Sequence, residues 1–196
     1  MKIAVFTDAH VNLAAEGPEN NRYYHLAEGL IGQLVDDLNQ SIRPDAVVCA
    51  GDLLDRGGEP EALNQYRQVR GILDRLDSPF IAIPGNHDGP DYNKVFGSGT
   101  AFIHDIMNVR FALFRDPERA GYNATREEES MLFMEKAAGH EGPLVSLQHV
   151  PLFPEGTTDC PYNYTNSGQI ITALQTGRYC LALSGHYHEG FDYQNG

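Results

Sequence analysis

The stretch AVVCAGDLLDRG, residues 46–57, carries the strongest indication of the fold class of this chain. Its first five residues form a short apolar run, and Gly51 and Asp52 follow directly. A short apolar run bounded by a glycine is typical of a buried β-strand. We therefore expect Asp52 to stand in a loop at the carboxyl end of a strand.

Two other runs repeat this order. Residues 2–6 read as a short buried strand and precede Asp8, and residues 79–83 precede Asn86. Between the runs, apolar residues recur at helical spacing, as in Leu26, Leu30 and Leu34, which predicts one helix from about Tyr23 to Gln40 and a second one after Pro60. This alternation predicts a parallel α/β sheet with functional side chains at the strand ends.

The pattern changes after Asp88. Residues 101–106 and 109–114 flank Met107 and Asn108, which predicts a β-hairpin and the start of a second, antiparallel layer. The remaining expected elements are helices over 127–138 and 168–174 and strands over 144–147 and 179–183. Because no repeat or linker interrupts the pattern, we expect residues 1–196 to form a single domain.

Composition narrows the function classes. The 196 residues carry 41% hydrophobic side chains, enough for one sizeable core, and a formal net charge of -13 that argues against bulk nucleic-acid binding. No apolar run is long enough to span a bilayer, and no signal peptide is visible. Three scattered cysteines, of which Cys49 and Cys180 fall in expected buried strands, are typical of a reducing compartment. We therefore expect a cytoplasmic protein without a membrane partner.

Five short motifs at expected strand ends contain residue types that bind metals. The candidate ligands are two carboxylates, one amide and four imidazoles: Asp8, His10, Asp52, Asn86, His149, His186 and His188. Such a mixed oxygen and nitrogen set accepts Mn, Fe, Zn or Co, as divalent or mixed-valence ions. The set is large enough for two ions that share one bridging carboxylate, and two such ions can clamp a phosphate ester. Each motif alone could equally be a plain turn or a structural histidine.

Four neighbouring residues are candidates for other roles. Arg56 could hold a phosphate oxygen, or it could simply pair with Asp55 at the surface. Asp55 is better suited to orienting a ligating histidine than to binding metal itself. His87, which a carboxylate would support, could protonate a leaving alkoxide, and Asp88 directly follows it. The candidate catalytic residues are His87, Asp52, Asp88 and Arg56.

As an ordered set, these motifs resemble those of the calcineurin-like metallophosphoesterases. The resemblance covers Asp8 to His188 and implies two packed mixed β-sheets flanked by helices, a four-layer αββα sandwich. It implies one metal held by Asp8, His10, Asp52 and His188, and a second held by Asp52, Asn86, His149 and His186. It also implies that His87 contacts the substrate and assists the leaving group.

The sequence departs from the family pattern near its end. The chain stops at Gly196, soon after His188, whereas relatives usually continue through further strands. We therefore expect a C-terminally short domain, which either lacks the last strands of the second sheet or completes that sheet with a partner chain. In the second case the protein would be a homo-oligomer.

The resulting hypothesis is metal-dependent hydrolysis of a small phosphate ester, with a metal-bound hydroxide as the nucleophile. A phosphodiester or nucleotide is favoured because residues 12–24 and the segment with Tyr162, Asn163, Tyr164 and Asn166 offer aromatic and amide groups, although ordinary loop composition explains them as well. The alternatives are a protein or small-molecule phosphomonoesterase, a nuclease, and a non-catalytic metal-binding scaffold.

Overall fold

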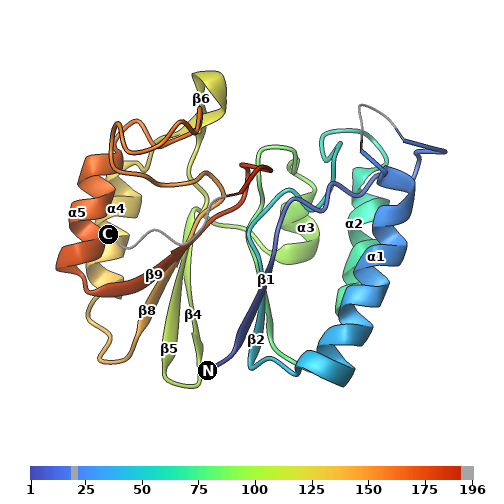
Figure 1. The fold of residues 1–196 in the computed structure, drawn as a ribbon, viewed down its shortest axis with the longest axis horizontal. Helices are drawn as coiled ribbons and strands as arrows, with labels where there is room; N and C mark the ends of the chain where they lie inside the picture. Colours follow the sequence, from blue (N-terminus) through green and yellow to red (C-terminus); the bar gives the residue numbers. More distant parts are fainter. Residues whose placement is uncertain (19–21, 191–196) are drawn as a thin grey trace. The chain divides into compact units, whose positions relative to one another are not determined.

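The computed structural model of the protein describes residues 1–18 and 22–190. Of the stretch 12–24 singled out above, residues 19–21 lie outside this range. The chain divides into two compact units, Met1–Gly99 and Thr100–Gly196 (Figure 1). The expected single domain stays a prediction.

The first unit contains a parallel three-stranded sheet in the order β1-β2-β3. Its strands are β1 (Ile3–Phe6), β2 (Ala46–Cys49) and β3 (Phe80–Ala82). The central strand β2 is buried along its whole length, as its apolar sequence predicts. The expectation of a buried first strand was wrong, because β1 lies at the edge of this sheet and Val5 is 45% exposed.

Helices α1 (Tyr24–Asp37) and α2 (Ala62–Leu73) run side by side in this unit (Figure 1). Their buried residues, among them Val35 and Val69, share one core cluster with Cys49 of β2. The first helix continues into a π-helical turn, Leu38–Ile42, and ends at Arg43 in the left-handed region. A short helix α3 (Tyr92–Phe96) was not predicted, because five residues are too few to show a helical period.

The second unit contains a mixed four-stranded sheet in the order β4-β5-β8-β9. The predicted hairpin is present as antiparallel β4 (Ala101–Ile106) and β5 (Val109–Phe114). Strands β8 (Leu144–Leu147) and β9 (Tyr179–Leu183) follow, parallel to β5. The expectation of an antiparallel second layer was therefore wrong beyond the hairpin, because helical segments between these strands allow parallel crossovers. Helices α4 (Glu128–Ala137) and α5 (Ser167–Thr176) contact this sheet and each other (Figure 1).

Two further features of this unit differ from expectation. A small two-stranded sheet, β6 (Glu118–Arg119) and β7 (Asn123–Ala124), with the 3-10 turn η2 (Ala120–Tyr122) between its strands, was not predicted. Cys180 is exposed rather than buried, because β9 is an edge strand whose residues alternate between partly buried and exposed. Its neighbour β8 is buried throughout.

The predicted fold class is confirmed: the chain is a mixed α/β protein with several sheets flanked by helices. Asp8, Asp52 and Asn86 follow the three strands of the first sheet, and His149 and His186 follow the last two strands of the second sheet. Within the described ranges, no helix has the length and apolar character that crossing a membrane requires.

Candidate metal centre

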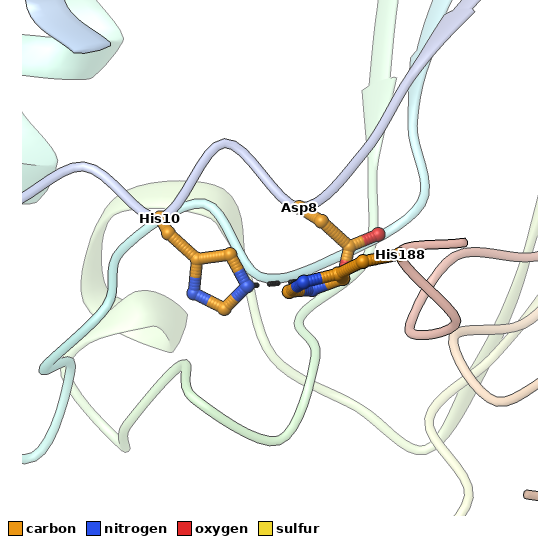
Figure 2. Close-up of side chains that lie close together, drawn as sticks. All are labelled: Asp8, His10 and His188. Atoms are coloured by element: carbon orange, nitrogen blue, oxygen red, sulfur yellow. Dashed lines mark ion pairs between the residues drawn. The ribbon is translucent and has the colours of Figure 1, made fainter. Parts of the chain in front are cut away.

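The loops that leave β1 and β2 lie against each other, backbone to backbone. The amide of Asp8 donates to the carbonyl of Gly51 at 3.0 Å, and the amide of His10 donates to the carbonyl of Asp52 at 3.0 Å. A further bond joins Val11 to Leu53 at 2.9 Å. This ladder extends the parallel pairing of the two strands and carries Asp8 and His10 alongside Asp52. The side chains of Asp8 and His10 lie on the same side of their segment (Figure 2).

These side chains converge for a different reason than expected. An extended segment would have placed residues two apart on one side, but Asp8 has a φ of 53° and His10 a φ of 44°. Asp52 (52°) and His186 (71°) also lie in the left-handed region. Non-glycine residues seldom adopt this region, and such strain persists where the surrounding structure holds it, often at functional sites. Four predicted ligands therefore share a costly backbone conformation.

His10 stands between three carboxylates. Its Nε2 lies 3.6 Å from Asp52 Oδ2 and 3.9 Å from Asp8 Oδ1, while its Nδ1 lies 3.3 Å from Asp55 Oδ1. Burial lowers the pKa of His10 to about 4, and the nearby Asp52 charge offsets this only in part. The imidazole is therefore neutral near pH 7, which is the form that binds a metal ion.

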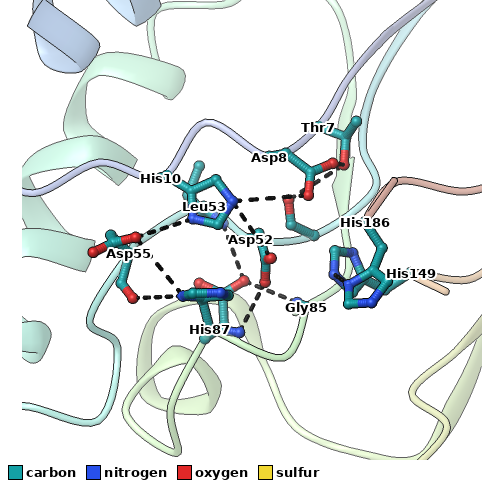
Figure 3. A network of polar contacts seen from close by, with 12 residues as sticks. Thr7, Asp8, His10, Asp52, Leu53, Asp55, Gly85, His87, His149 and His186 are labelled. Carbon is teal, nitrogen blue, oxygen red and sulfur yellow. Dashed lines mark hydrogen bonds and ion pairs between the residues drawn. The ribbon is translucent and has the colours of Figure 1, made fainter. Parts of the chain in front are cut away.

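Asp55 contacts two histidines with different atoms, as Figure 3 shows. Its carboxylate faces Nδ1 of His10, and its backbone carbonyl lies 2.8 Å from Nδ1 of His87. One ligand atom from each of His10, Asp55 and His87 falls within 4.8 Å of the other two, close enough for all three to contact one ion. The prediction that Asp55 orients a histidine agrees with these contacts, and it applies to both rings.

Arg22 is a member of this group to which sequence reasoning gave no role of its own, although it lies within residues 12–24, named above as a possible pocket lining. Its guanidinium Nη1 lies 3.0 Å from Asp55 Oδ1 and 3.3 Å from His10 Nδ1. Arg22 is distant from every motif in the sequence and belongs to no periodic segment, so only the folded chain reveals its position. The positive charge of Arg22 offsets the negative charge of Asp55. Like burial, it lowers the pKa of His10.

Asp88 does not support His87 as its sequence position suggested. Its carboxylate instead accepts hydrogen bonds from the amides of Leu53, Leu54 and Gly85 and from the Tyr66 hydroxyl, at 2.9 to 3.1 Å. Desolvation by burial raises the pKa of Asp88, an effect that the three amide donors oppose. The carboxylate near His87 is that of Asp55, at 3.8 Å. Asp88 thus joins the loop after β2 to the loop after β3.

The remaining candidates of the first unit flank this group. Asp52 is buried, and its Oδ1 accepts the His87 amide at 2.9 Å, which leaves Oδ2 toward His10. Asn86 precedes His87 in the loop after β3. Arg56 is exposed and pairs with Asp55 at 3.6 Å and with Glu59 at 3.8 Å, so the surface ion pair named as the alternative is present.

The second unit brings together two of its three predicted ligands. The loops after β8 and β9 are joined by the Gly185 amide, which donates to the His149 carbonyl at 2.9 Å. His149 Nε2 and His186 Nδ1 lie 3.2 Å apart, with their rings edge to face (Figure 3). His188 is exposed in the turn that follows. At this distance one nitrogen can donate a hydrogen bond to the other, and the two nitrogens are also close enough to bind one metal ion together.

The donor chemistry within each unit therefore fits metal ions. The first unit offers a neutral histidine beside two carboxylates, and the second offers a close pair of imidazole nitrogens. The two carboxylates in question, Asp8 and Asp52, are each fixed by a hydrogen bond, from the Thr7 hydroxyl at 2.7 Å and from the His87 amide. Fixed donors of this kind are typical of metal ligands.

Comparison with known proteins gives phosphodiesterases among the similar sequences. The chain is 43% identical over 67 residues to a cAMP/cGMP dual specificity phosphodiesterase of Mycobacterium tuberculosis, across 32% of this chain and 20% of that protein. It is 29% identical over 136 residues to the glycerophosphodiester phosphodiesterase GpdQ of Enterobacter lignolyticus, across 67% of this chain and 44% of that protein. It is 32% identical over 96 residues to a subunit of the nuclease SbcCD of Bacillus subtilis, across 46% of this chain and 23% of that protein.

The chain spans less than half the length of each of these three relatives. The match to the family is much more extensive than the match to any one of them. The model of the calcineurin-like phosphoesterase family covers residues 1–190, nearly the whole chain and every motif described above. The chain therefore belongs to the calcineurin-like phosphoesterase family.

Proposed function

We propose that this protein is a metal-dependent hydrolase of small phosphodiesters, nucleotides included. Family membership supports a phosphoric ester hydrolase, and two of the relatives named above are phosphodiesterases. The observation that carries the proposal is the group formed by His10, Asp55 and His87 beside Asp52. It combines neutral and acidic metal donors with a histidine that can exchange a proton.

The proposed metal ligands follow the ordered motifs of the family. One ion would be held by Asp8, His10, Asp52 and His188, and the other by Asp52, Asn86, His149 and His186. When bound, two such ions (Mn, Fe, Zn or Co) lower the pKa of bound water and neutralise charge on the phosphoryl oxygens. The arrangement within each unit supports this assignment, because both units hold their donors close together.

Asp55 would set the orientation of His10. If Nδ1 of His10 donates its hydrogen to Asp55 Oδ1 at 3.3 Å, the lone pair of Nε2 points toward the Asp8 and Asp52 carboxylates. A carboxylate that accepts from the far nitrogen of a ligating histidine fixes both the tautomer and the ring plane. The role proposed for Asp55 is therefore positioning, through His10.

His87 would deliver the proton to the departing oxygen. Its Nδ1 lies 2.8 Å from the Asp55 carbonyl, and because a carbonyl only accepts, Nδ1 must carry a hydrogen. The transferable proton is therefore the one on Nε2, and His87 acts as an acid in its doubly protonated form. The Asp55 carboxylate lies 3.8 Å from the same Nδ1.

Substrates with different leaving groups test this function. We expect the metal-loaded protein to hydrolyse bis-nitrophenyl phosphate faster than nitrophenyl phosphate, and chelation to abolish both activities. We expect His87→Ala to reduce the rate on a diester with an alkyl leaving group by about 10²- to 10⁴-fold, and the rate on the nitrophenyl diester much less, because nitrophenolate departs without a proton.

His104→Ala is the matched control, since His104 is an exposed histidine on β4 outside the motifs. Equal losses on both diesters in the His87 variant would remove its role as general acid. A higher rate on nitrophenyl phosphate would favour the phosphomonoesterase alternative. Metal-bound protein without turnover of any phosphate ester would identify a non-catalytic scaffold.

A further inference from the structure

Tyrosine rings gather around His186 in the second unit. The ring centroid of Tyr162 lies 4.5 Å from that of His186, and Tyr187 follows at 6.1 Å from Tyr162. Tyr122 also contacts Tyr162, with ring centroids 6.4 Å apart and ring planes at 84°. A continuous row of aromatic rings therefore leads from a predicted metal ligand to Tyr122, which is 57% exposed.

The backbone at Tyr122 is the second observation. Gly121 has a φ of 74° and Tyr122 a φ of 59°, so two consecutive residues lie in the left-handed region. Glycine adopts this region freely, but a bulky aromatic residue there is a genuine outlier. Burial does not compensate for the strain, because the side chain is largely in solvent. Strain of this kind is maintained where the surrounding structure enforces it, and it marks functional positions.

Side-chain amides enforce this conformation. Asn123 donates to the Ala120 carbonyl at 3.0 Å and accepts the Asn163 amide at 2.9 Å, which fastens the η2 turn to the segment after Tyr162. The side chain of Asn163 in turn bonds both the amide and the carbonyl of Phe153, at 3.2 and 3.0 Å. Tyr122 and Tyr162 are thus presented by a cross-linked scaffold.

The neighbouring polar residues are occupied by this scaffold. Tyr164 is buried and donates to Asp116 at 2.8 Å, and Asn166 bonds both the amide and the carbonyl of Arg126. Of the segment that the sequence suggested as a pocket lining, only Tyr162 therefore stays a candidate for contacting a ligand. Tyr122, which the sequence did not single out, lies beside it.

We propose that Tyr122 and Tyr162 form an aromatic subsite that stacks on the base of a nucleotide-type phosphodiester. Tyr162 also packs against His186 and Tyr187, whereas Tyr122 is 57% exposed, so the Tyr122 ring offers the open surface for stacking. Aromatic side chains bind bases in this way with little dependence on base identity. The inference rests on the proposed phosphodiesterase activity and specifies its substrate class.

Two diesters with the same leaving group and charge isolate the base. Thymidine 5′-(4-nitrophenyl phosphate) carries a nucleoside, and methyl 4-nitrophenyl phosphate does not. We expect Tyr122→Gly to raise KM for the thymidine ester about tenfold and to leave KM for the methyl ester within about twofold, as the loss of one stacking contact implies. Tyr122→Phe, which keeps the ring, should retain the preference of the natural protein.

Met107→Gly is the matched control. Met107 is also an exposed residue with a positive φ, 55°, and it lies at the turn of the β4–β5 hairpin. Both glycine variants should keep or raise the Tm, because glycine relieves the backbone strain, but only Tyr122→Gly should change the preference between the esters. If the Tm of Tyr122→Gly falls, the Tyr122→Phe variant, which keeps the aromatic ring, distinguishes a loss of stability from a loss of base binding.

The outcomes distinguish failure of the proposed phosphodiesterase function from failure of the aromatic subsite. If the natural protein turns over neither ester, the proposed function fails, and the subsite is then measured by calorimetric binding of thymidine 5′-phosphate, which Tyr122→Gly should weaken at least fivefold. The subsite proposal is overturned if Tyr122→Gly leaves KM for the thymidine ester unchanged, alters both esters equally, or binds the nucleotide as tightly as the natural protein does.

Discussion

At the scale of single residues, the carboxylate that follows His87 in the sequence is not the one that contacts the His87 ring. Asp88 follows His87 directly, yet it faces the amides of Leu53, Leu54 and Gly85, and Asp55 from another loop supplies the contacts to His87. Sequence adjacency does not predict this, because successive side chains in an irregular loop point in directions that the backbone dihedrals decide.

Asp88 is consequently a residue whose loss should weaken the fold before it affects chemistry. In Asp88→Asn, one acceptor oxygen becomes an NH₂ group that faces former donors, so at least one of the four bonds to the carboxylate is lost. We expect the free energy of unfolding to fall by about 2–4 kcal/mol, measured by denaturant unfolding of the metal-free protein.

Asp91→Asn provides the comparison for this variant. Asp91 pairs with Lys94 at 2.6 Å, but the Lys94 side chain is 64% exposed, and such surface pairs contribute about 1 kcal/mol at most. A destabilisation of Asp88→Asn no larger than that of Asp91→Asn would show that Asp88 does not join the loops.

At the scale of elements, the loops after β2 and β3 meet backbone to backbone. The amide of Gly57 donates to the carbonyl of His87 at 3.0 Å, and a Cβ placed on Gly57 would overlap Gly89 and the Tyr66 hydroxyl. Glycine at this position is therefore required by close approach. This contact, together with Asp88, fixes the distance between the loop that carries Asp52 and the loop that carries His87.

Gly57→Ala tests the close approach. The added Cβ would lie 2.7 Å from the His87 carbonyl oxygen and still closer to Gly89, so the two loops must separate. We expect a loss of about 1–3 kcal/mol in the free energy of unfolding, with lower metal content and lower activity, because Asp52 and His87 move apart. Denaturant unfolding and elemental analysis of the purified variant measure both effects.

The adjacent glycine supplies the matched change. A Cβ on Gly58 would meet nothing within 4 Å, so Gly58→Ala should change stability by less than about 0.5 kcal/mol and leave metal content unaltered. If both variants behave alike, the separation between these loops does not matter for the site.

Elements with a clear apolar period were predicted almost to the residue. The hairpin strands Ala101–Ile106 and Val109–Phe114 and the strands Leu144–Leu147 and Tyr179–Leu183 have the predicted bounds. Elements too short to show a period, such as α3 and the β6–β7 pair, were missed. The types of the site residues were readable because strand ends carry the motifs, whereas Arg22 and Tyr122 depend on tertiary contacts that leave no local signal.

At the scale of the whole molecule, the proposed ligands come from both units of the chain. Asp8, His10, Asp52 and Asn86 belong to the first unit, and His149, His186 and His188 belong to the second. The proposal that the two sets serve the same ions rests on the ordered motifs of the family, which extend across both units. Metal binding should then stabilise the folded chain through residues of either unit.

Thermal unfolding with and without Mn²⁺ tests this coupling. An ion that binds only the native state stabilises it by about 2.7 kcal/mol at a hundredfold excess over Kd, which for a chain of this size raises Tm by roughly 5–10 °C. We expect His149→Ala, in the second unit, to lose most of this rise relative to its own chelated baseline, while His104→Ala keeps it. Since Asp52 is the proposed bridging ligand, Asp52→Asn should lose at least as much. A full rise in His149→Ala, with loss in Asp52→Asn alone, would mean that the ions are held by the first unit without the histidines of the second.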